Sequence, residues 1–530
     1  MMARIRVFLR LALAGMALLC TLWPALCAES TIRLVTTEAS RGKIDPGIVT
    51  ETFVLSPDSR RVAYVAQRGK KQLVVVDGVP GREFDSIRSG GPAFSPDSKR
   101  LAYVATRGGK ELLVVDAAEG KEYNAVIPGD SIFSPDSQRV AYCVFRGDKS
   151  FVVVNGAEGR AYDLRCPLKS PPVLSPQGSR VAYVRKRYVD THVLRPSPAG
   201  VGSYRESAVG GVRNFVVVDE AEGKTYAWVD GSPIFSPDGK RVAYIAFQGK
   251  KQLVVVDAVE GREYDTIGKR GPIFSPDSSR VAYCASRGGK WLVVLDAGEE
   301  AEYDGIGEGS PVFSPDGKRV AYVAFRGKKR LVVVVEVASA EYDAVGQGRP
   351  IFSPDSKRVA YVAFRGSKQL VVLDGAESPE YDGIGDLTFS PDSKRVAYAA
   401  GNGEKLFVVV DGAQGRDYGG IAEHSPIFSP DSKRVAYVAG RGDKRLVVVD
   451  GVAGAEYDGI AELSFSPDSQ RVAYMAWRGD KRFVVVDGVA GPQYDALARG
   501  AKLAFDSPGV LHTLAVRGDE LLCVQVQIAE

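Results

Sequence analysis

The three histidines of this 530-residue sequence are the first side chains to consider for metal binding or acid–base catalysis. His192, His424 and His512 lie in distant segments, and none has a second ligand at a spacing typical of metal sites. The sequence also has no Gly-x-Ser-x-Gly elbow, no glycine-rich phosphate loop and no cysteine paired with a histidine. We therefore predict no metal site, no cofactor and no activated nucleophile.

Carboxylates are abundant, but they recur at fixed positions. One follows Ser-Pro, one follows a valine run, and two flank a tyrosine, as Glu302 and Asp304 do. A catalytic acid is usually singular, whereas these residues are periodic, so we interpret them as turn formers and edge charges. A calcium site built from them would lack the usual Asp-x-Asp-x-Asp loop. The sequence therefore favours a protein that is not an enzyme.

Basic residues recur as Arg-Gly-x-Lys or a close variant, at turns that should share one face of the molecule. The pairs are Arg68 and Lys70, Arg107 and Lys110, Arg146 and Lys149, Arg287 and Lys290, Arg326 and Lys328, Arg365 and Lys368, Arg441 and Lys444, and Arg478 and Lys481. They predict a ring of positive charge suited to an anionic partner. The alternative, which we favour, is solvated hairpin tips that nearby acids such as Glu308, Asp386 and Glu423 partly neutralise.

One segment of about 22 extra residues interrupts the spacing near residues 185–213, and it is rich in Arg, Gly, Pro and Tyr. Insertions on a rigid scaffold often carry function, and the alternative is a loop without a role. The candidate partner-binding residues are Arg185, Lys186, Arg187, Tyr188, His192, Arg195, Tyr204 and Arg205.

The elements that position these residues belong to a repeat. The stretch Phe352-Ser-Pro-Asp-Ser-Lys-Arg-Val-Ala-Tyr361 recurs along the whole chain, with its proline at 57, 96, 135, 176, 237, 276, 315, 354, 391, 430 and 467 and a degenerate copy at 508. Apart from the insertion, neighbouring copies lie 37 to 41 residues apart. A fixed period of this size indicates a repeat architecture.

Each unit predicts four short antiparallel strands. In the unit from 349 to 385, Ser-Pro-Asp, Arg-Gly and Asp-Gly turns separate β-branched and aromatic runs. The two middle strands are apolar without interruption, so both of their faces should be covered, whereas the fourth strand carries charge and should lie at a wet edge. Small sheets of this kind stack radially as the blades of a β-propeller.

The motif Phe-Ser-Pro-Asp-(Ser/Gly)-Lys-Arg-Val-Ala-Tyr resembles the signature of the WD-repeat-like propeller family, which includes the C-terminal propeller of TolB. The resemblance covers about residues 49 to 518. It implies an all-β propeller of about twelve four-stranded blades and a possible envelope-associated protein partner. We expect the chain to depart from TolB in having no α/β domain before its repeats, and from the propeller-bearing prolyl peptidases in having no hydrolase domain after them.

Twelve blades exceed the usual four to eight per ring. We expect two six-bladed rings, with one large ring as the alternative. The segment 42–48 falls where a fourth strand should lie, and the last repeat supplies only three strands. We therefore expect the two termini to pair and to close the ring, which would remove two open sheet edges.

Residues 1–28 have the pattern of an export signal. Arg4, Arg6 and Arg10 precede an apolar core, and small residues follow near Ala28. A retained anchor helix and a lipoprotein acylated at Cys27 are the alternatives. The predicted organisation is a signal peptide at 1–28, blades 1 to 6 at 29–308, and blades 7 to 12 at 309–530, closed by the N-terminal strand.

Charge and cysteine content add two expectations. Removing the three arginines of the leader lowers the formal net charge from +4 to +1, which gives no general case for nucleic-acid binding. No other segment has the length of a membrane span. Cys143 and Cys284 occupy the same position in their repeats and should be small buried hydrophobic residues, not a disulfide pair.

Together these patterns predict an exported, non-catalytic propeller that binds proteins as a scaffold in a bacterial periplasm or outside the cell. The expected partner is an envelope protein or an anionic envelope polymer, not nucleic acid, and the chain should be a monomer. The alternative is a propeller enzyme, a hydrolase or lyase of polysaccharide or peptide, with its site at the mouth of the channel. Such a site would need residues that depart from the repeat and converge there.

Overall fold

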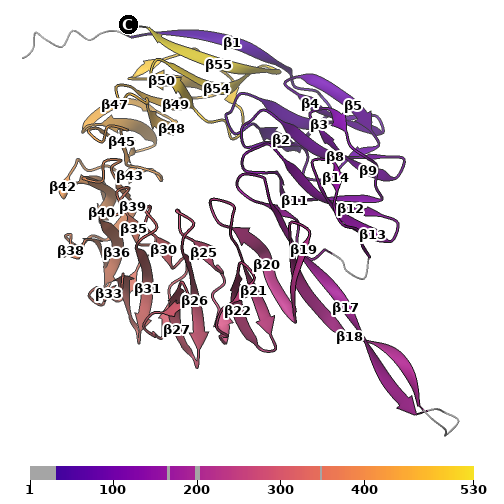
Figure 1. Cartoon of the computed structure of the whole chain (residues 1–530). Helices are drawn as coiled ribbons and strands as arrows, with labels where there is room; N and C mark the ends of the chain where they lie inside the picture. The colour runs from indigo at the N-terminus through magenta and orange to yellow at the C-terminus, as the bar shows by residue number, and fades with distance from the viewer. Residues whose placement is uncertain (1–31, 164–167, 197–202, 347–348, 530) are drawn as a thin grey trace, which may run out of the picture.

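The computed structural model describes residues 32–163, 168–196, 203–346 and 349–529, and the predicted signal peptide lies outside this range. The described residues form twelve antiparallel sheets and no helix. Figure 1 shows the sheets as blades arranged around a common centre, with the first and last strands, β1 (Arg33–Lys43) and β55 (Glu520–Ala529), side by side. The predicted all-β propeller of twelve four-stranded blades is confirmed. The described residues therefore include no helix that is long and apolar enough to cross a membrane.

The two middle strands of each blade carry the uninterrupted apolar runs. Their central residues are buried on both faces, as in β26, where Val281 to Ala285 are all at most 8% exposed. The second strands are β3 (Val62–Arg68), β8 (Leu101–Arg107), β12 (Val140–Arg146), β17 (Val181–Pro196), β21 (Val242–Gln248), β26 (Val281–Arg287), β31 (Val320–Arg326), β36 (Val359–Arg365), β40 (Val396–Asn402), β45 (Val435–Arg441), β49 (Val472–Arg478) and β54 (Val510–Arg517). The third strands are β4 (Lys71–Val76), β9 (Lys110–Val115), β13 (Lys149–Val154), β18 (Ser203–Val218), β22 (Lys251–Val256), β27 (Lys290–Leu295), β32 (Lys329–Val334), β37 (Lys368–Leu373), β41 (Lys405–Val410), β46 (Lys444–Val449), β50 (Lys481–Val486) and β55 (Glu520–Ala529).

The outermost strand of each blade is largely exposed, and in most blades it is short. These strands are β5 (Val79–Phe84), β10 (Ala118–Glu119), β14 (Ala157–Glu158) with β15 (Tyr162–Asp163), β19 (Ala221–Tyr226), β23 (Val259–Glu260), β28 (Gly298–Glu299), β33 (Val337–Ala338), β38 (Ala376–Glu377), β42 (Ala413–Gln414), β47 (Val452–Tyr457), β51 (Val489–Ala490) and, from the N-terminus, β1 (Arg33–Lys43). In the blades with a two-residue outer strand, a tyrosine further along bridges back to the third strand, as Tyr264 does to Gln252.

The innermost strand is interrupted in most blades. A short loop, which we call the inner loop, leaves the sheet between its two halves on the side of the ring centre. The inner strands are β2 (Ile48–Leu55), β6 (Ser86–Ile87) with β7 (Ala93–Phe94), β11 (Ala125–Phe133), β16 (Val173–Leu174), β20 (Trp228–Phe235), β24 (Thr266–Ile267) with β25 (Ile273–Phe274), β29 (Gly305–Ile306) with β30 (Val312–Phe313), β34 (Ala344–Val345) with β35 (Ile351–Phe352), β39 (Gly383–Phe389), β43 (Gly420–Ile421) with β44 (Ile427–Phe428), β48 (Gly459–Phe465) and β52 (Ala496–Leu497) with β53 (Ala504–Ser507).

The blades form one ring, so the expectation of two six-bladed rings is wrong and the single-ring alternative holds. Each of twelve hydrophobic clusters joins two neighbouring blades, and one of them packs the last blade on the first. At the midpoint, Cys284 and Val293 pack against Val320 and Tyr322 as in every other junction. The physical reason is that blades 6 and 7 pack against each other across residues 308 and 309, so the row of blades does not end at the expected boundary.

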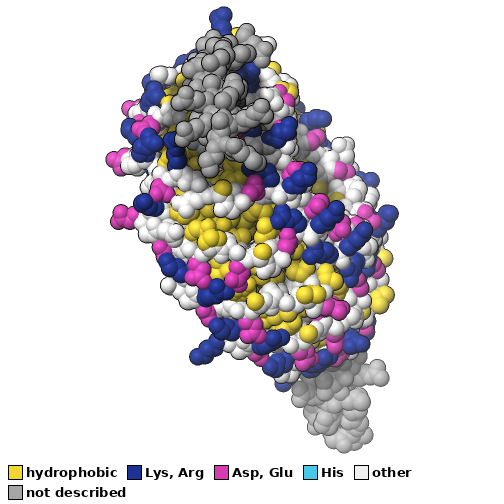
Figure 2. Space-filling model, turned by 90° about the vertical axis from the view of Figure 1, so that its left-hand side faces the viewer, with side chains coloured by type: hydrophobic (Ala, Val, Ile, Leu, Met, Phe, Trp, Pro, Cys, Tyr) yellow, Lys and Arg dark blue, Asp and Glu magenta, His cyan; other side chains and the backbone are white. Residues whose placement is uncertain are grey.

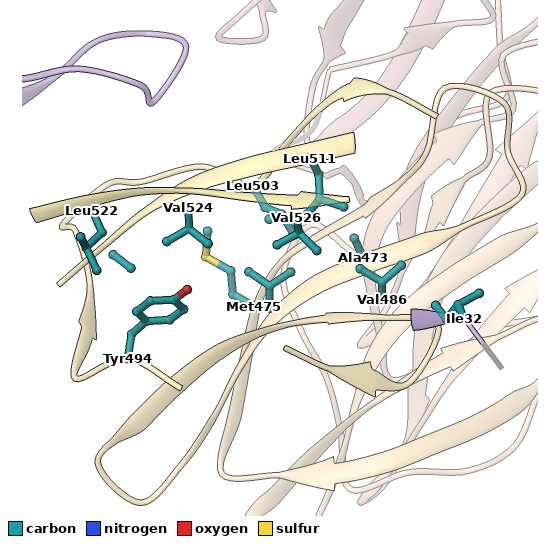
Figure 3. Close-up of a cluster of buried hydrophobic side chains, with 12 residues drawn as sticks. Ile32, Ala473, Met475, Val486, Tyr494, Leu503, Leu511, Leu522, Val524 and Val526 are labelled. Atoms are coloured by element: carbon teal, nitrogen blue, oxygen red, sulfur yellow. The ribbon is translucent and has the colours of Figure 1, made fainter. Parts of the chain in front are cut away.

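The termini close the ring as expected, although the N-terminal strand lies earlier than the predicted 42–48. β1 pairs antiparallel with β55, from Arg33 opposite Ala529 to Lys43 opposite Glu520. Figure 3 shows the buried cluster behind this closure, in which Ile32 from the N-terminus and Met475 of β49 lie near Leu511 and Val526 of the last blade. The closure therefore covers the edge that β55 would otherwise expose.

Candidate functional site

The repeated Ser-Pro-Asp motif ties each blade to the next one. In the ninth blade, Ser390 Oγ donates to Asp392 Oδ1 at 2.7 Å and accepts from Arg395 N at 2.9 Å. Asp392 N then donates to Ser432 Oγ of the tenth blade at 2.9 Å. These bonds hold the serine hydroxyl, and none of its partners in them is a histidine that could activate it. The predicted role as a turn residue is therefore confirmed at this position.

The arginine of the motif spans the same junction. Arg395 Nε lies 2.8 Å from Asp411 Oδ2 and its Nη1 donates to Lys433 O of the next blade at 2.7 Å, while its guanidinium lies over the ring of Phe428 at 5.3 Å. Equivalent Arg–Asp pairs are Arg61–Asp77, Arg100–Asp116, Arg180–Asp219, Arg241–Asp257, Arg280–Asp296, Arg358–Asp374, Arg434–Asp450 and Arg471–Asp487. These carboxylates are structural ties.

The opposite face, which carries the Arg-Gly-x-Lys hairpins, has its own ties. Asp304 Oδ1 accepts from Lys290 Nζ at 2.5 Å and its Oδ2 accepts from Gly327 N of the next blade at 2.6 Å. The hydrogen bonds from Lys290 and Gly327 lower the pKa of the Asp304 carboxyl. The same Lys–Asp pair recurs as Lys71–Asp85, Lys251–Asp265, Lys329–Asp343, Lys368–Asp382, Lys444–Asp458 and Lys481–Asp495.

The hairpin arginines are also paired within their own blades. Arg287 donates to Glu299 of the outer strand and to Glu302, each at 3.1 Å, and Arg107 holds the pKa of Glu119 at about 2. The acids that neutralise the hairpins are therefore outer-strand and junction carboxylates. Glu308, Asp386 and Glu423, which we expected there, lie instead in inner-strand segments, where Asp386 accepts from His424 N at 2.6 Å. The structure thus supports the interpretation that the hairpin tips are solvated and neutralised, and not the alternative of a ring of free positive charge.

Grooves open between neighbouring blades at the outer rim. Four of them, at the junctions of blades 4/5, 5/6, 8/9 and 10/11, have volumes of about 560, 410, 440 and 450 Å³. In the groove between blades 5 and 6, Val254 and Val256 lie beside Tyr283 of the next blade, and Val259 at the lip is 71% exposed. Figure 2 looks onto the rim on the side of β33, β38 and β42 and shows apolar side chains gathered between charged ones.

One groove departs from the repeat. Between blades 6 and 7, Glu300 stands where most blades have glycine, and Val335 and Glu336 replace the usual Asp-Gly. With Arg280, Lys318 and Tyr322 they line a cavity of about 130 Å³. Burial raises the pKa of the Glu300 carboxyl, Glu336 raises it further, and Arg280 opposes the shift. This is a singular carboxyl, of the kind that the periodic acids are not.

The inner loops are the segments that vary most from blade to blade. Several of their basic residues reach a carbonyl of the next blade: Arg270 Nη1 donates to Gly309 O at 2.6 Å, and Lys169 Nζ donates to Val229 O. Lys169 also lies 3.4 Å from the ring centre of Trp228. These side chains therefore link neighbouring blades at the inner rim. The described contacts do not place them together as the residues of an active site would be.

The predicted insertion is a projecting hairpin. β17 and β18 continue past the blade as a two-stranded ribbon, which we call the arm, and Figure 1 shows it running away from the ring. The predicted site residues fall along it: His192 pairs with Ser207, and Arg195 pairs with Tyr204. Arg205 pairs with Leu194. For these outer residues the structure describes the strand and not the side chain.

At the base of the arm the predicted site divides. Arg185 is fully buried, donates to Ser150 Oγ of the preceding blade at 2.9 Å and lies 3.8 Å from the ring centre of Tyr162. It is therefore a structural residue that a partner cannot reach. Lys186 is half-buried, Arg187 pairs with Glu222 at 2.7 Å, and the Tyr188 side chain is 42% exposed. Sequence reasoning could not separate these residues, because burial of Arg185 depends on the small Ser150 opposite it.

The histidines and cysteines are placed far apart. His512 is buried at the seam of the first and last blades, with Nδ1 2.9 Å from Asp506 and Nε2 2.7 Å from Asp58 O. Cys143 and Cys284 are buried and unpaired, and burial raises their pKa values to about 11 and about 12. Within the described ranges, no three His, Cys, Asp or Glu side chains gather as metal ligands would.

The sequence matches no protein-family model and no curated protein. Solved structures with a similar chain path include TolB from Acinetobacter baumannii (TM-score 0.21, 15% identity, 51% of this chain and 78% of that chain). They also include the β-propeller domain of the Trilobed protease from Pyrococcus furiosus (0.25, 13%, 62% and 94%) and the GH74 enzyme from Niastella koreensis (0.24, 13%, 89% and 82%). Similarity at this level carries no inference about activity. What the chain's own structure establishes is a twelve-bladed propeller.

Proposed function

We propose that this protein is an exported, non-catalytic scaffold of the bacterial cell envelope that binds a partner through the arm. One observation carries the proposal. Many of the charged side chains that recur along the repeat are engaged within their blade or with the next one, whereas the arm extends beyond this frame. A rigid ring with one projecting element suits a binding protein, because binding residues are commonly presented by insertions on a stable scaffold.

The test compares the mature chain with a variant that lacks the arm. Residues 188–212 are replaced by Gly-Asp, which reproduces the tight Arg146-Gly-Asp-Lys149 hairpin of the third blade between Arg187 and Arg213. Both proteins are used as bait in a pull-down from envelope extract. We expect an envelope protein to be captured by the intact chain and lost with the shortened hairpin. Equal capture by both, with the same thermal stability, would contradict binding through the arm.

A second candidate function is a propeller enzyme acting on polysaccharide or peptide. The observation in its favour is the raised pKa of Glu300, which lines the cavity between blades 6 and 7 together with Glu336, since a carboxyl whose pKa is raised by burial and by a neighbouring carboxyl is suited to acid–base chemistry. Hydrolysis of polysaccharide and peptide libraries tests it. Activity lost in Glu300→Gln and kept in Glu119→Gln, a periodic acid, would replace the scaffold proposal.

A further inference from the structure

The arm leaves two strand edges without a neighbour. The inner strand follows β17 only as far as the bridge between Leu168 and Arg185, and the outer strand follows β18 only as far as Tyr226 opposite Asn214. In the described chain no strand other than β18 pairs with β17 beyond Arg185. Residues 187–195 therefore present about 30 Å of open edge. An isolated two-stranded ribbon is marginally stable in water, and an open edge is a template for a further strand.

The direction of the backbone groups on this edge follows from its first residues. Val184 N donates to Ser170 Oγ at 3.2 Å and Val184 O accepts from Lys169 N at 2.8 Å, so both groups of Val184 face the inner edge. In an antiparallel strand the side of these groups alternates with each residue. The groups of residue 186 still belong to the bridge at Leu168 and Arg185, so the N–H and C=O groups of residues 188, 190, 192 and 194 face the open side of β17, while those of the residues between them bind β18.

The two edges of the arm are not equivalent. The register of β17 with β18 shifts between Val189 and Asp190, where Gly210 is the extra residue on β18. A bulge of this kind interrupts regular pairing along its own strand and is one way in which edges are protected. β17 has no insertion, and Pro196 ends its run of donors. The edge that remains able to pair is that of β17.

The charge of the arm indicates what pairs with it. Residues 186–213 contain five Lys or Arg and two Asp or Glu, a formal charge of +3. A second copy of the arm would bring the same charge, and an antiparallel pairing of two β17 strands about Thr191 would set Arg187 opposite Arg195. An acidic strand would be attracted by the positive charge of the arm, whereas a second arm would be repelled by it. Charge complementarity therefore favours a foreign acidic segment.

We propose that the β17 edge, residues 187–195, takes up an extended acidic segment of a partner polypeptide as an added β-strand. The main-chain groups of alternate residues supply the hydrogen bonds and the basic residues of the arm supply the selectivity, as in other cases of β-strand addition. This inference rests on the proposed function, because it names how the arm would bind and which class of partner it would bind.

The test uses a fluorescent ten-residue peptide of alternating Glu and Val, with an alternating Lys and Val peptide as its charge control, and the full mature chain. His192→Pro removes one N–H from the open edge and leaves the bonds to β18 in place, whereas His192→Ala keeps the N–H. We expect the Glu peptide to bind, the Lys peptide to bind at least tenfold more weakly, and His192→Pro but not His192→Ala to weaken the Glu peptide at least tenfold. Equal thermal unfolding of the two variants confirms that both fold.

Several results would overturn the inference. Equal binding of the Glu and Lys peptides, equal affinity of the two variants, or no peptide binding would each do so. Concentration-dependent dimers that His192→Pro abolishes would assign the edge to a second copy of the chain. The proposed function is judged separately: an envelope protein that the intact arm captures, and that His192→Pro captures equally well, would keep the scaffold and discard strand addition.

Discussion

Arg185 stands where most other blades have a buried alanine, and the chain accommodates it by placing Ser150 in the facing position of the preceding blade. The guanidinium is fully buried beside the rings of Tyr162 and Tyr183. A charged group in such a place must be held by its surroundings, because its transfer from water is costly. The residue thus fastens the base of the arm to two blades.

Removing this side chain should therefore weaken the junction of blades 3 and 4. We expect Arg185→Ala to lower the free energy of unfolding in urea by about 2–4 kcal/mol, because it leaves a cavity and an unpaired Ser150 hydroxyl. Arg187→Ala, whose ion pair with Glu222 is partly exposed, should cost about 1 kcal/mol or less. Equal losses in the two variants would show that Arg185 is not the fastening residue.

Lys169 offers a pH test at the same scale. Burial lowers the pKa of its amine to about 8, Asp230 opposes this shift and Lys186 adds to it. Below about pH 8 the folded chain carries the cost of a half-buried ammonium, whereas in the unfolded chain the lysine amine has a pKa of about 10.4. Between these values the unfolded state binds more protons, so the contribution of Lys169 to stability rises with pH.

The stability of Lys169→Met relative to the natural chain should therefore fall as the pH rises from 7 to 10. Urea unfolding of both proteins at several pH values measures this difference, in which the titration of the shared tyrosines and carboxylates cancels. A difference that stays constant over this range would mean that the Lys169 amine has an ordinary pKa.

At the scale of the element, the Asp-Gly turn shows how one carboxylate joins the end of the third strand to the start of the second. Asp411 adopts a φ of 52°, its Oδ1 accepts from Val396 N at 2.9 Å, and its Oδ2 pairs with Arg395 at 2.8 Å. The third blade has Asn155 in this position, where its Oδ1 still accepts from Val140 N at 2.9 Å. The backbone bond is thus common to both residue types, and the ion pair is not.

We expect Asp411→Ala to lower the free energy of unfolding by about 2–3 kcal/mol, because it removes both bonds and places alanine in a left-handed conformation. Asp411→Asn should cost about 1 kcal/mol or less, since asparagine tolerates this conformation and keeps the bond to Val396. Urea unfolding of the two variants distinguishes these contributions. A similar loss for both would assign the stability to the Arg395 pair alone.

The blade itself could be predicted from the sequence, because its information is local. The Ser-Pro-Asp turn, the uninterrupted apolar runs and the charged fourth strand each specify their own geometry. The ties between blades could not be predicted, because the partners of Asp304, namely Lys290 and Gly327, lie on two different blades. The acids expected beside the hairpins, such as Glu308, lie in the inner-strand segments instead. Their position could not be predicted because the break in the inner strand has no strong sequence signal.

At the scale of the whole molecule, the number of rings was the expectation that failed. Each blade contacts only its two neighbours, so the ring size depends on the angle at each junction, which arises from side-chain packing. The junction near residue 308 packs like the others, and no local pattern reports the sum of twelve small angles. The complementary termini were predictable, because a missing fourth strand at one end and a spare strand at the other are visible in the repeat.

Glu38 ties the closing strand to the last blade. Glu38 of β1 accepts from Arg517 at 2.6 Å and from Tyr494 Oη at 2.8 Å. Within the ring, Glu299 does the same for Arg287 and Tyr264. Glu38 therefore acts as the outer-strand acid of the last blade, although 479 residues separate it from Arg517. The hydrogen bond from Arg517 lowers the pKa of Glu38, so its contribution to stability is complete above the ordinary pKa of a carboxyl and is lost as the pH falls through the lowered value.

A chain that begins at residue 44 should consequently fold into an open-edged ring that is less stable and that associates with itself through β55. The lost contacts include Ile32 and Leu34 against the cluster of the last blade, as well as the pairing along β1. A synthetic peptide of residues 32–43 should restore the melting temperature and the sedimentation coefficient of the natural chain, whereas the same peptide with Glu38→Ala should bind more weakly and a scrambled peptide should do neither. If the shortened chain melts and sediments like the natural one, the seam between the termini does not hold the ring closed, and the hydrophobic contacts of the last blade with the first suffice.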